Sequence, residues 1–155
     1  MNVSAKADYG MRAMLELVAS YEQNPNAVVK GDVIARAQQV PVKFLEAILR
    51  QLRLAGLVSA TRGPDGGYRL DRSPEDISVA DVIRALDGPL AAVRGSRPED
   101  LAYNGPAEHL RDVWVAARAA IRDVLEHVTL AQVAHGSLPA QVRDLLAEPG
   151  AWQRR

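Results

Sequence analysis

The chain has 155 residues, 48% of them hydrophobic and 25% charged, which is enough to bury one core and carry an appended element. It contains no cysteine, which excludes disulfides, cysteine-bound zinc and iron–sulfur clusters held by thiolates. The formal net charge is zero, yet residues 1–72 hold ten basic and seven acidic side chains, whereas residues 73–155 hold nine and twelve.

This uneven charge favours a nucleic-acid-reading first half on a second half that does not touch nucleic acid. Residues 1–8 have no apolar run behind a basic start, so they do not resemble a signal peptide. No stretch approaches the roughly 18 apolar residues of a membrane span. We therefore expect a cytoplasmic protein that has no membrane partner.

The first third of the chain has the pattern of a helix-turn-helix. Apolar residues at helical spacing predict a first helix over residues 5–21, with Ser4 as its N-cap. A short helix over residues 31–38 follows. Pro41 then stands in the first turn of a third helix, which Gly56 ends. Two helices joined by a tight turn, the second longer and more basic, are typical of this DNA-binding motif.

The next segment predicts a β-hairpin and a further helix. Residues 57–61 and 68–70 read as strands around the glycine-rich turn 62–67, an arrangement called a wing. Ser78 and Asp81 form a capping-box-like pair that opens a helix closed by residues 87–89. The expected fold class is therefore mainly α with a small hairpin wing (α+β), a winged helix-turn-helix.

We divide the chain into four parts on this basis. Residues 1–90 form the DNA-binding head and residues 91–107 a linker that holds a possible effector site. Residues 108–135 form a dimerisation helix, read most clearly over residues 108–128. The tail, residues 136–155, carries one weak helix near residues 141–147.

The third helix presents two opposite faces. Apolar side chains on one face would dock it on the head, and the charged strip on the other could enter a major groove. The strip consists of Lys43, Glu46, Arg50 and Arg53. An ordinary solvated helix face explains the same pattern, so the strip alone leaves both readings open.

The hairpin tip strengthens the DNA-binding reading. Arg62 ends a strand beside Gly63, Gly66 and Gly67. Small residues allow the backbone to approach a phosphate chain while a long cation reaches into the minor groove. A flexible hairpin with a solvated arginine is the alternative. The tip lacks the Walker spacing and leads to a strand, so we expect no phosphate cofactor there.

The long helix carries an apolar stripe that is longer than the head needs for its own core. We interpret it as a dimerisation surface that packs on its twin and on the partner's first helix. A helix buried within its own chain is the alternative. The stripe comprises Leu110, Val113, Trp114, Ala117, Ile121, Val124, Leu125 and Val128, with Ala120 between them.

The sequence offers little for catalysis. There is no cysteine nucleophile, and His109, His127 and His135 show no metal-ligand spacing. Paired carboxylates at residues 75–76 and 99–100 lie in polar turns, where solvated surface is the ordinary reading. We therefore expect a protein that is not an enzyme and holds no metal.

Taken in order, these segments resemble the Rrf2 family of winged-helix transcription regulators over about residues 1–135. The segments that carry the resemblance are SAK at 4–6 with Tyr9, Pro41 with FLEAIL at 44–49, LRLAGLV at 52–58, RGPDGGYRL at 62–70, DVIRALDGPL at 81–90, and VW at 113–114 with TL at 129–130.

The resemblance implies a homodimer that binds double-stranded DNA, usually as a repressor. Two reading heads on a two-fold axis would match a palindromic operator. It implies that Lys43 and Glu46 begin the reading helix, that Arg62 is the wing arginine of a motif including Tyr68, and that Lys6 and Tyr9 lie near the DNA backbone. Better-known members hold an iron–sulfur cluster through three cysteines. Here Glu108, six residues before Trp114, stands where the third would be expected.

We therefore expect a cluster-lacking member without a cofactor, answering to a small molecule or protein near residues 90–108. Tyr103 and Trp114 are suggested as walls of a pocket there. A winged-helix adaptor that binds another protein, without sequence-specific DNA binding, remains the alternative. Removing the basic strip and Arg62 would distinguish the two.

Overall fold

The computed structural model describes residues 2–153, which form an elongated molecule with a helical head at one end. The head contains α1 (Ala5–Gln23), α2 (Gly31–Gln38), α3 (Val42–Leu54), β1 (Val58–Thr61), β2 (Gly67–Leu70), the 3-10 turn η1 (Pro74–Asp76) and α4 (Val79–Asp87). The rest contains the 3-10 turns η2 (Pro98–Asp100) and η3 (Gly105–Ala107), then α5 (Leu110–Leu125), α6 (Leu130–His135) and α7 (Ala140–Ala147).

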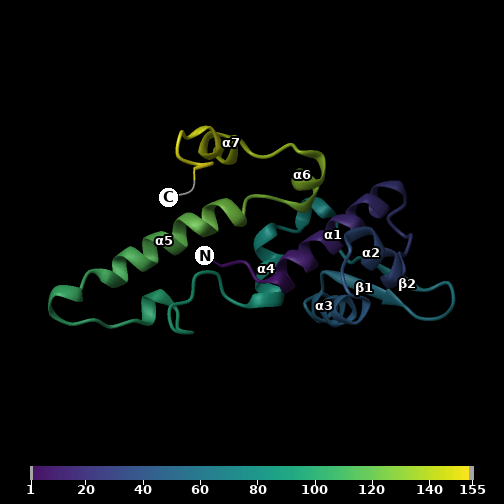
Figure 1. Ribbon diagram of the computed structural model, residues 1–155, viewed down its shortest axis with the longest axis horizontal. Helices are drawn as coiled ribbons and strands as arrows, with labels where there is room; N and C mark the ends of the chain where they lie inside the picture. Colours follow the sequence, from purple (N-terminus) through teal and green to yellow (C-terminus); the bar gives the residue numbers. More distant parts are fainter. Residues whose placement is uncertain (1, 154–155) are drawn as a thin grey trace.

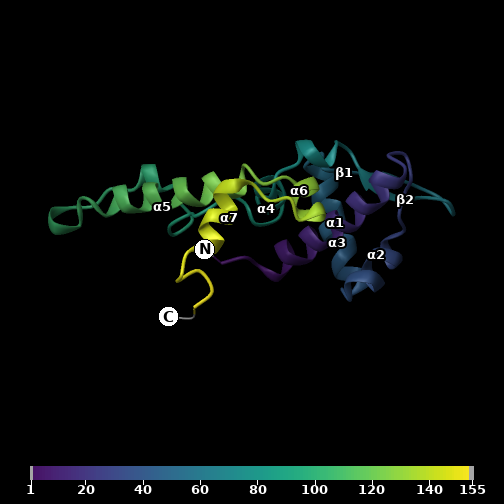
Figure 2. The same cartoon turned by 90° about the horizontal axis from the view of Figure 1, so that it is seen from above.

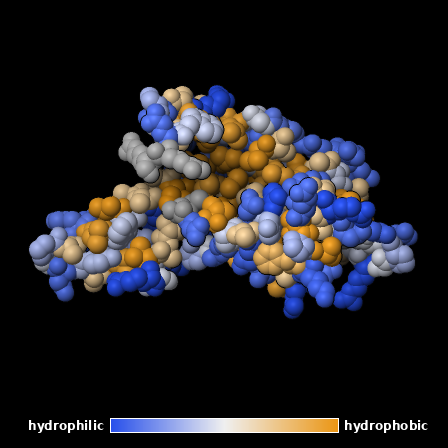
Figure 3. All heavy atoms as spheres, in the orientation of Figure 1, coloured by the Kyte–Doolittle hydropathy of each residue, from blue (hydrophilic) through white to orange (hydrophobic). Residues whose placement is uncertain are grey.

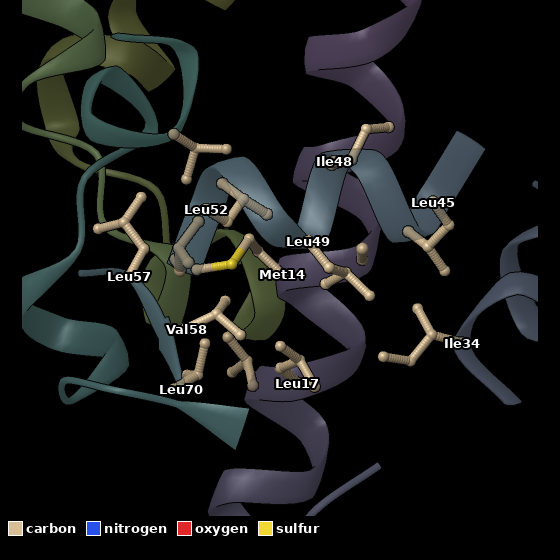
Figure 4. Close-up of a cluster of buried hydrophobic side chains, with 14 of the residues drawn as sticks. Met14, Leu17, Ile34, Leu45, Ile48, Leu49, Leu52, Leu57, Val58 and Leu70 are labelled. Atoms are coloured by element: carbon tan, nitrogen blue, oxygen red, sulfur yellow. The ribbon is translucent and has the colours of Figure 1, made fainter. Parts of the chain in front are cut away.

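One hydrophobic core holds the head together. The apolar face of α3 lies against α1, with side chains of α2 and of the hairpin closing the sides (Figure 4). Met14, Val18, Leu49 and Leu52 have no exposed surface. Burying each such side chain stabilises the fold by about 1.5–3 kcal/mol, and the same burial fixes which face of α3 remains outside.

The helix-turn-helix and the wing form as expected, with small shifts at their ends. Pro41 is the N-cap of α3 rather than a residue of its first turn. Gly67 begins the returning strand rather than ending the turn, because it pairs with Thr61 in the antiparallel register. Val29 adds a bridge on the other edge of β2, exchanging two backbone hydrogen bonds of 2.8 Å with Tyr68.

Side-chain caps fix the starts of α1 and α4. The Ser4 hydroxyl accepts a hydrogen bond from the backbone N–H of Ala7 at 3.0 Å. Ser78 and Asp81 form a full capping box, in which each side chain accepts from the other residue's backbone N–H. The two capping predictions are therefore confirmed, and α4 packs along α1.

The expectation that residues 108–135 form one continuous helix is wrong, because α5 ends at Leu125 and a second helix follows. Thr129 and Gln132 form a capping box that starts α6. The chain turns back there because Leu130, which has no exposed surface, belongs to the head's core. Val128 lies in the connection, is itself buried, and offers a partner almost no surface.

α5 extends away from the head as a projecting arm (Figures 1 and 2). None of its sixteen residues is buried. α7 lies beside α5, where the Gln141 amide donates a hydrogen bond to the Asp123 carboxylate. Apolar surface is concentrated in the hollow between the end of α5, α6 and α1 (Figure 3).

Among residues 2–153, no helix is both long enough and apolar enough to cross a membrane.

Candidate DNA-binding surface

The fold turns the charged face of α3 outward. Leu45, Ile48, Leu49 and Leu52 are buried against the head. Lys43, Glu46, Arg50 and Arg53 are all exposed on the other side, as their spacing predicts. An amphipathic helix anchored along its full length in this way presents a rigid row of side chains.

A groove of about 640 Å³ separates this row from the wing. It brings together eight of the eleven residues predicted to meet DNA: Glu46, Arg50, Arg53, Arg62, Gly63, Gly66, Gly67 and Tyr68. It also includes Lys30, which the sequence reasoning missed. Lys30 precedes α2 and lies far from the wing in sequence, but the bridge between Val29 and Tyr68 places it there.

The groove is strongly basic. Four cations, Lys30, Arg50, Arg53 and Arg62, face a single carboxylate, that of Glu46. Within the described part of the chain, no ion pair engages any of the four cations. Their charges are exposed to solvent and free to bind phosphate oxygens, the contact that dominates protein–DNA affinity.

Glycine is required on the inner side of the wing. A β-carbon on Gly66 would stand 2.1 Å from the carbonyl oxygen of Thr61, and one on Gly67 would stand 2.6 Å from that of Val29. Any side chain at either position would force the strands and the bridge apart. The two glycines therefore keep the hairpin close to the head and set where Arg62 projects.

The remaining three predicted DNA contacts lie outside the groove. The Tyr9 ring packs edge-on against Phe44 at the start of α3, with centroids 5.7 Å apart, and the Arg12 guanidinium lies 4.7 Å from the Tyr9 ring. Lys43 immediately precedes Phe44 in the chain and is exposed. Lys6 lies at the start of α1, where its Nζ is 3.9 Å from Asp87 Oδ1.

The residues predicted to dimerise divide into three groups. Leu110, Val113 and Ala117 are exposed, with 56% of Val113 accessible. Trp114, Ile121, Val124 and Leu125 are half-buried, and Ile121 and Leu125 rest on a small cluster formed by Ala80, Ile83 and Leu90. Only Val128 is buried within its own chain. The stripe on α5 is therefore largely uncovered.

The suggested effector pocket has different walls from those expected. Trp114 lines a cavity of about 440 Å³ together with Leu90 and Val93, but Tyr103 is not part of it. The indole N–H of Trp114 is buried and has no hydrogen-bond partner. This cavity opens on the uncovered stripe of α5, through Trp114, Ala117 and Ile121.

Comparison with known proteins decides the family. Residues 3–136 match the profile of the Rrf2 family, described as iron-dependent transcriptional regulators. The chain belongs to the Rrf2 family. It is 50% identical over 145 residues to an HTH-type transcriptional regulator of Mycobacterium tuberculosis, an alignment that covers 94% of this chain and 88% of that protein. It is 34% identical over 134 residues to CymR of Bacillus subtilis, covering 86% and 90%.

Solved structures of the same family share the fold. The structure of CymR, the global cysteine regulator of B. subtilis, superposes with a TM-score of 0.72 at 32% identity and covers 88% of this chain and 98% of that one. IscR of T. potens gives 0.70 at 33% identity, covering 91% of each. This Rrf2 protein is thus a winged-helix transcriptional regulator rather than an enzyme.

The family is described as iron-dependent, but the described residues of this chain do not form a site that fits iron. The chain has no cysteine to supply thiolates. Among residues 2–153, no three His, Asp or Glu side chains are grouped in a way that could hold a metal ion.

Proposed function

We propose that this Rrf2 protein is a homodimeric repressor that reads a palindromic operator and works without an iron–sulfur cluster. In each protomer α3 enters the major groove and the wing places Arg62 in the adjacent minor groove. The basic groove between them carries this proposal: four cations that form no ion pair within residues 2–153 line one concave surface between α3 and the wing.

Different residues of the groove are suited to different DNA contacts, which supports sequence-specific DNA binding. Arg50 and Arg53 lie along an exposed helix face, from which guanidinium groups can reach guanine edges. Glu46 on the same face can accept a hydrogen bond from a cytosine amino group. Lys30 and the backbone of the glycine-rich tip are suited to phosphate contacts, which fix register without reading sequence.

The two-fold arrangement is supported by the uncovered stripe of α5. A C2 dimer buries the same patch on both protomers and displays two reading heads related by a two-fold axis. Such heads match half-sites about one helical turn apart, roughly 34–36 Å, in a palindrome.

The absence of a cluster is supported by the lack of thiolates and of any grouped ligands among residues 2–153. Protein purified under anaerobic conditions is expected to lack stoichiometric iron and sulfide and the visible absorbance of a cluster. Operator affinity is expected to be the same before and after treatment with an iron chelator. Stoichiometric iron, or DNA binding that is lost with it, would contradict this part of the proposal.

The test of the whole proposal is a mobility-shift titration against the promoter of the chain's own gene, with a random duplex as control and at two salt concentrations. A discrete, specific shift that weakens as salt rises is expected, because phosphate contacts release counterions. Expression of a reporter placed behind the same promoter should increase when the gene for this protein is deleted. A decrease would indicate activation instead of repression. Equal affinity for both duplexes would favour the adaptor alternative.

A further inference from the structure

A second basic site lies where α4 of the head meets α5, the arm, and we call this region the joint. α4, the linker turn η2 and α5 enclose a cleft of about 300 Å³. Four arginines line this arginine cleft: Arg84 from α4, Arg97 beside η2, and Arg118 and Arg122 from α5. Pro89 and Leu90 supply its apolar wall and Glu99 its one lining carboxylate. The volume is at the lower end of the range for small-molecule sites, roughly 300–1,000 Å³.

The arginines of the cleft outnumber the acids that neutralise them. Glu126 binds Arg84 and Arg122 together, the Arg122 contact being 2.9 Å, and Glu99 binds Arg118. Two carboxylates thus face four guanidiniums, which leaves an excess of two positive charges. The hydrogen bond from Arg84, followed by that from Arg122, lowers the pKa of Glu126, so this acid is ionised at neutral pH.

Such a cluster is suited to an anion with two negative charges. Guanidinium groups bind phosphate and carboxylate oxygens through two parallel hydrogen bonds. Like charges held close together are unfavourable unless a counter-charge lies between them. Arg118 is the least exposed of the cleft arginines that form ion pairs, with 18% of its side chain exposed against 39% for Arg84 and 49% for Arg122.

The other cavity at the joint, beside Trp114, does not offer an equally free site. Its walls include Trp114, Ala117 and Ile121, which belong to the stripe that a second copy would cover. The arginine cleft uses different residues of α5, namely Arg118 and Arg122, which face α4 and the linker. Covering the stripe therefore does not require covering Arg118 or Arg122.

We propose that the arginine cleft binds a small dianion, a phosphorylated, sulfated or dicarboxylate molecule, and that this ligand adjusts DNA binding. The regulatory part rests on the proposed function. Arg84 belongs to the reading head, Arg97 to the linker and Arg118 to the arm, so one ligand contacts all three. A dianion also competes with Glu126 for Arg84 and Arg122, which changes the ion pairs that join α4 to the end of α5.

Binding is tested first without DNA. Isothermal titration of the full chain with inorganic phosphate, sulfate or succinate, at constant ionic strength and against chloride, should show saturable binding of at least one dianion. Comparing the affinities for phosphate and sulfate with that for succinate shows whether the cleft prefers a tetrahedral oxyanion or a dicarboxylate. Arg97→Ala should weaken that binding about tenfold, because a charge-assisted contact is lost. Arg111→Ala, which removes a charge from α5 at a position outside the cleft, is the control.

Arg97 is an informative choice because it is exposed and forms none of the ion pairs found within residues 2–153, so its removal should leave the fold intact. The double variant R97A/R122A should lose the remaining affinity. If no dianion binds better than chloride, or if R97A and R111A weaken binding equally, the cleft is not an anion site.

Coupling is then measured by repeating the operator titration with the dianion that binds. The operator affinity should change about fivefold or more, and the operator should change the dianion's affinity by the same factor, as linkage requires. R97A should lose this response. Dianion binding with no effect on DNA would overturn the regulatory role while leaving the site, and an absence of specific DNA binding would overturn the proposed function instead. If R97A lowers DNA affinity and its salt dependence with no dianion bound, the cleft binds DNA phosphates and the proposal is wrong.

Discussion

At the scale of single residues, the wing's proposed contribution to DNA binding rests on Arg62. It lies at the exposed edge of the basic groove and forms no ion pair within the described residues. Arg62→Ala should weaken operator binding by roughly 1–3 kcal/mol if the side chain makes a specific groove contact. Fluorescence anisotropy with operator and random duplexes measures this, and Arg111→Ala controls for the loss of one charge. Full operator affinity in R62A would remove the wing from the reading mechanism.

Gly67 tests whether the wing must be held against the head. Because Gly67 has no side chain, β2 can lie close to the backbone of Val29. A β-carbon on Gly67 would be only 2.6 Å from the Val29 carbonyl oxygen. Gly67→Ala should therefore separate Val29 from Tyr68 and cost about 1–3 kcal/mol in the free energy of unfolding. Urea denaturation measures the loss. Gly31→Ala is the control, because a β-carbon there meets Tyr68 at an ordinary 3.4 Å; equal stability of both variants would contradict the argument.

At the scale of elements, short sequence patterns predicted the features that depend on interactions between residues close together in the chain. The two capping residues Ser4 and Ser78, the faces of α3 and the hairpin were all readable, because each depends on residues a few positions apart. The break between α5 and α6 was missed. Apolar residues continue at helical spacing across this break. Leu130 is one of them, but it is buried in the core of the head and not on the stripe of α5. The signal available was Thr129 followed three residues later by Gln132, a capping box.

The joint between α4 and α5 should respond to acid. Hydrogen bonds from Arg84 and Arg122 lower the pKa of Glu126 below its usual 4.5. The ion pairs of Glu126 therefore stabilise the folded protein fully above pH 4.5. This stabilisation is lost as the pH falls through the lowered pKa of Glu126. Glu126→Gln should melt below the wild type near pH 7, and the difference should shrink at a pH well below 4.5.

Thermal melts of both proteins at the two pH values measure this effect. Glu108→Gln, at an exposed glutamate outside the ion pairs of residues 2–153, is the control and should match the wild type at both. A difference between E126Q and the wild type that stays constant with pH would show that Glu126 acts through packing rather than charge.

At the scale of the whole molecule, sequence reasoning placed the groove but not its full lining or the joint. Lys30 enters the groove only because an isolated bridge carries residue 29 to the wing. The arginine cleft joins residues from α4, the linker and α5, which no short pattern connects. Charges brought together by tertiary packing leave no periodic signal, whereas a helix face does.

The proposed dimer rests on the arm's stripe, in which Val113 is the most exposed large apolar residue among those of α5. Val113→Asp should leave the protomer folded, because 56% of Val113 is accessible there. In a dimer it would bury an unpaired carboxylate, which costs about 3 kcal/mol or more and raises the dimer's dissociation constant about a hundredfold. Operator binding should weaken with it, since two half-sites can no longer be held together.

Sedimentation velocity over a range of protein concentrations measures the oligomeric state, and circular dichroism checks that the variant is folded. Ala119→Asp is the matched control: it adds the same charge at an exposed position of α5 outside the stripe and should leave the dimer intact. If V113D and A119D both remain dimeric at the wild-type concentration dependence, the two protomers meet through a surface other than α5. If both dissociate, added negative charge on the arm, rather than burial of the stripe, governs the association.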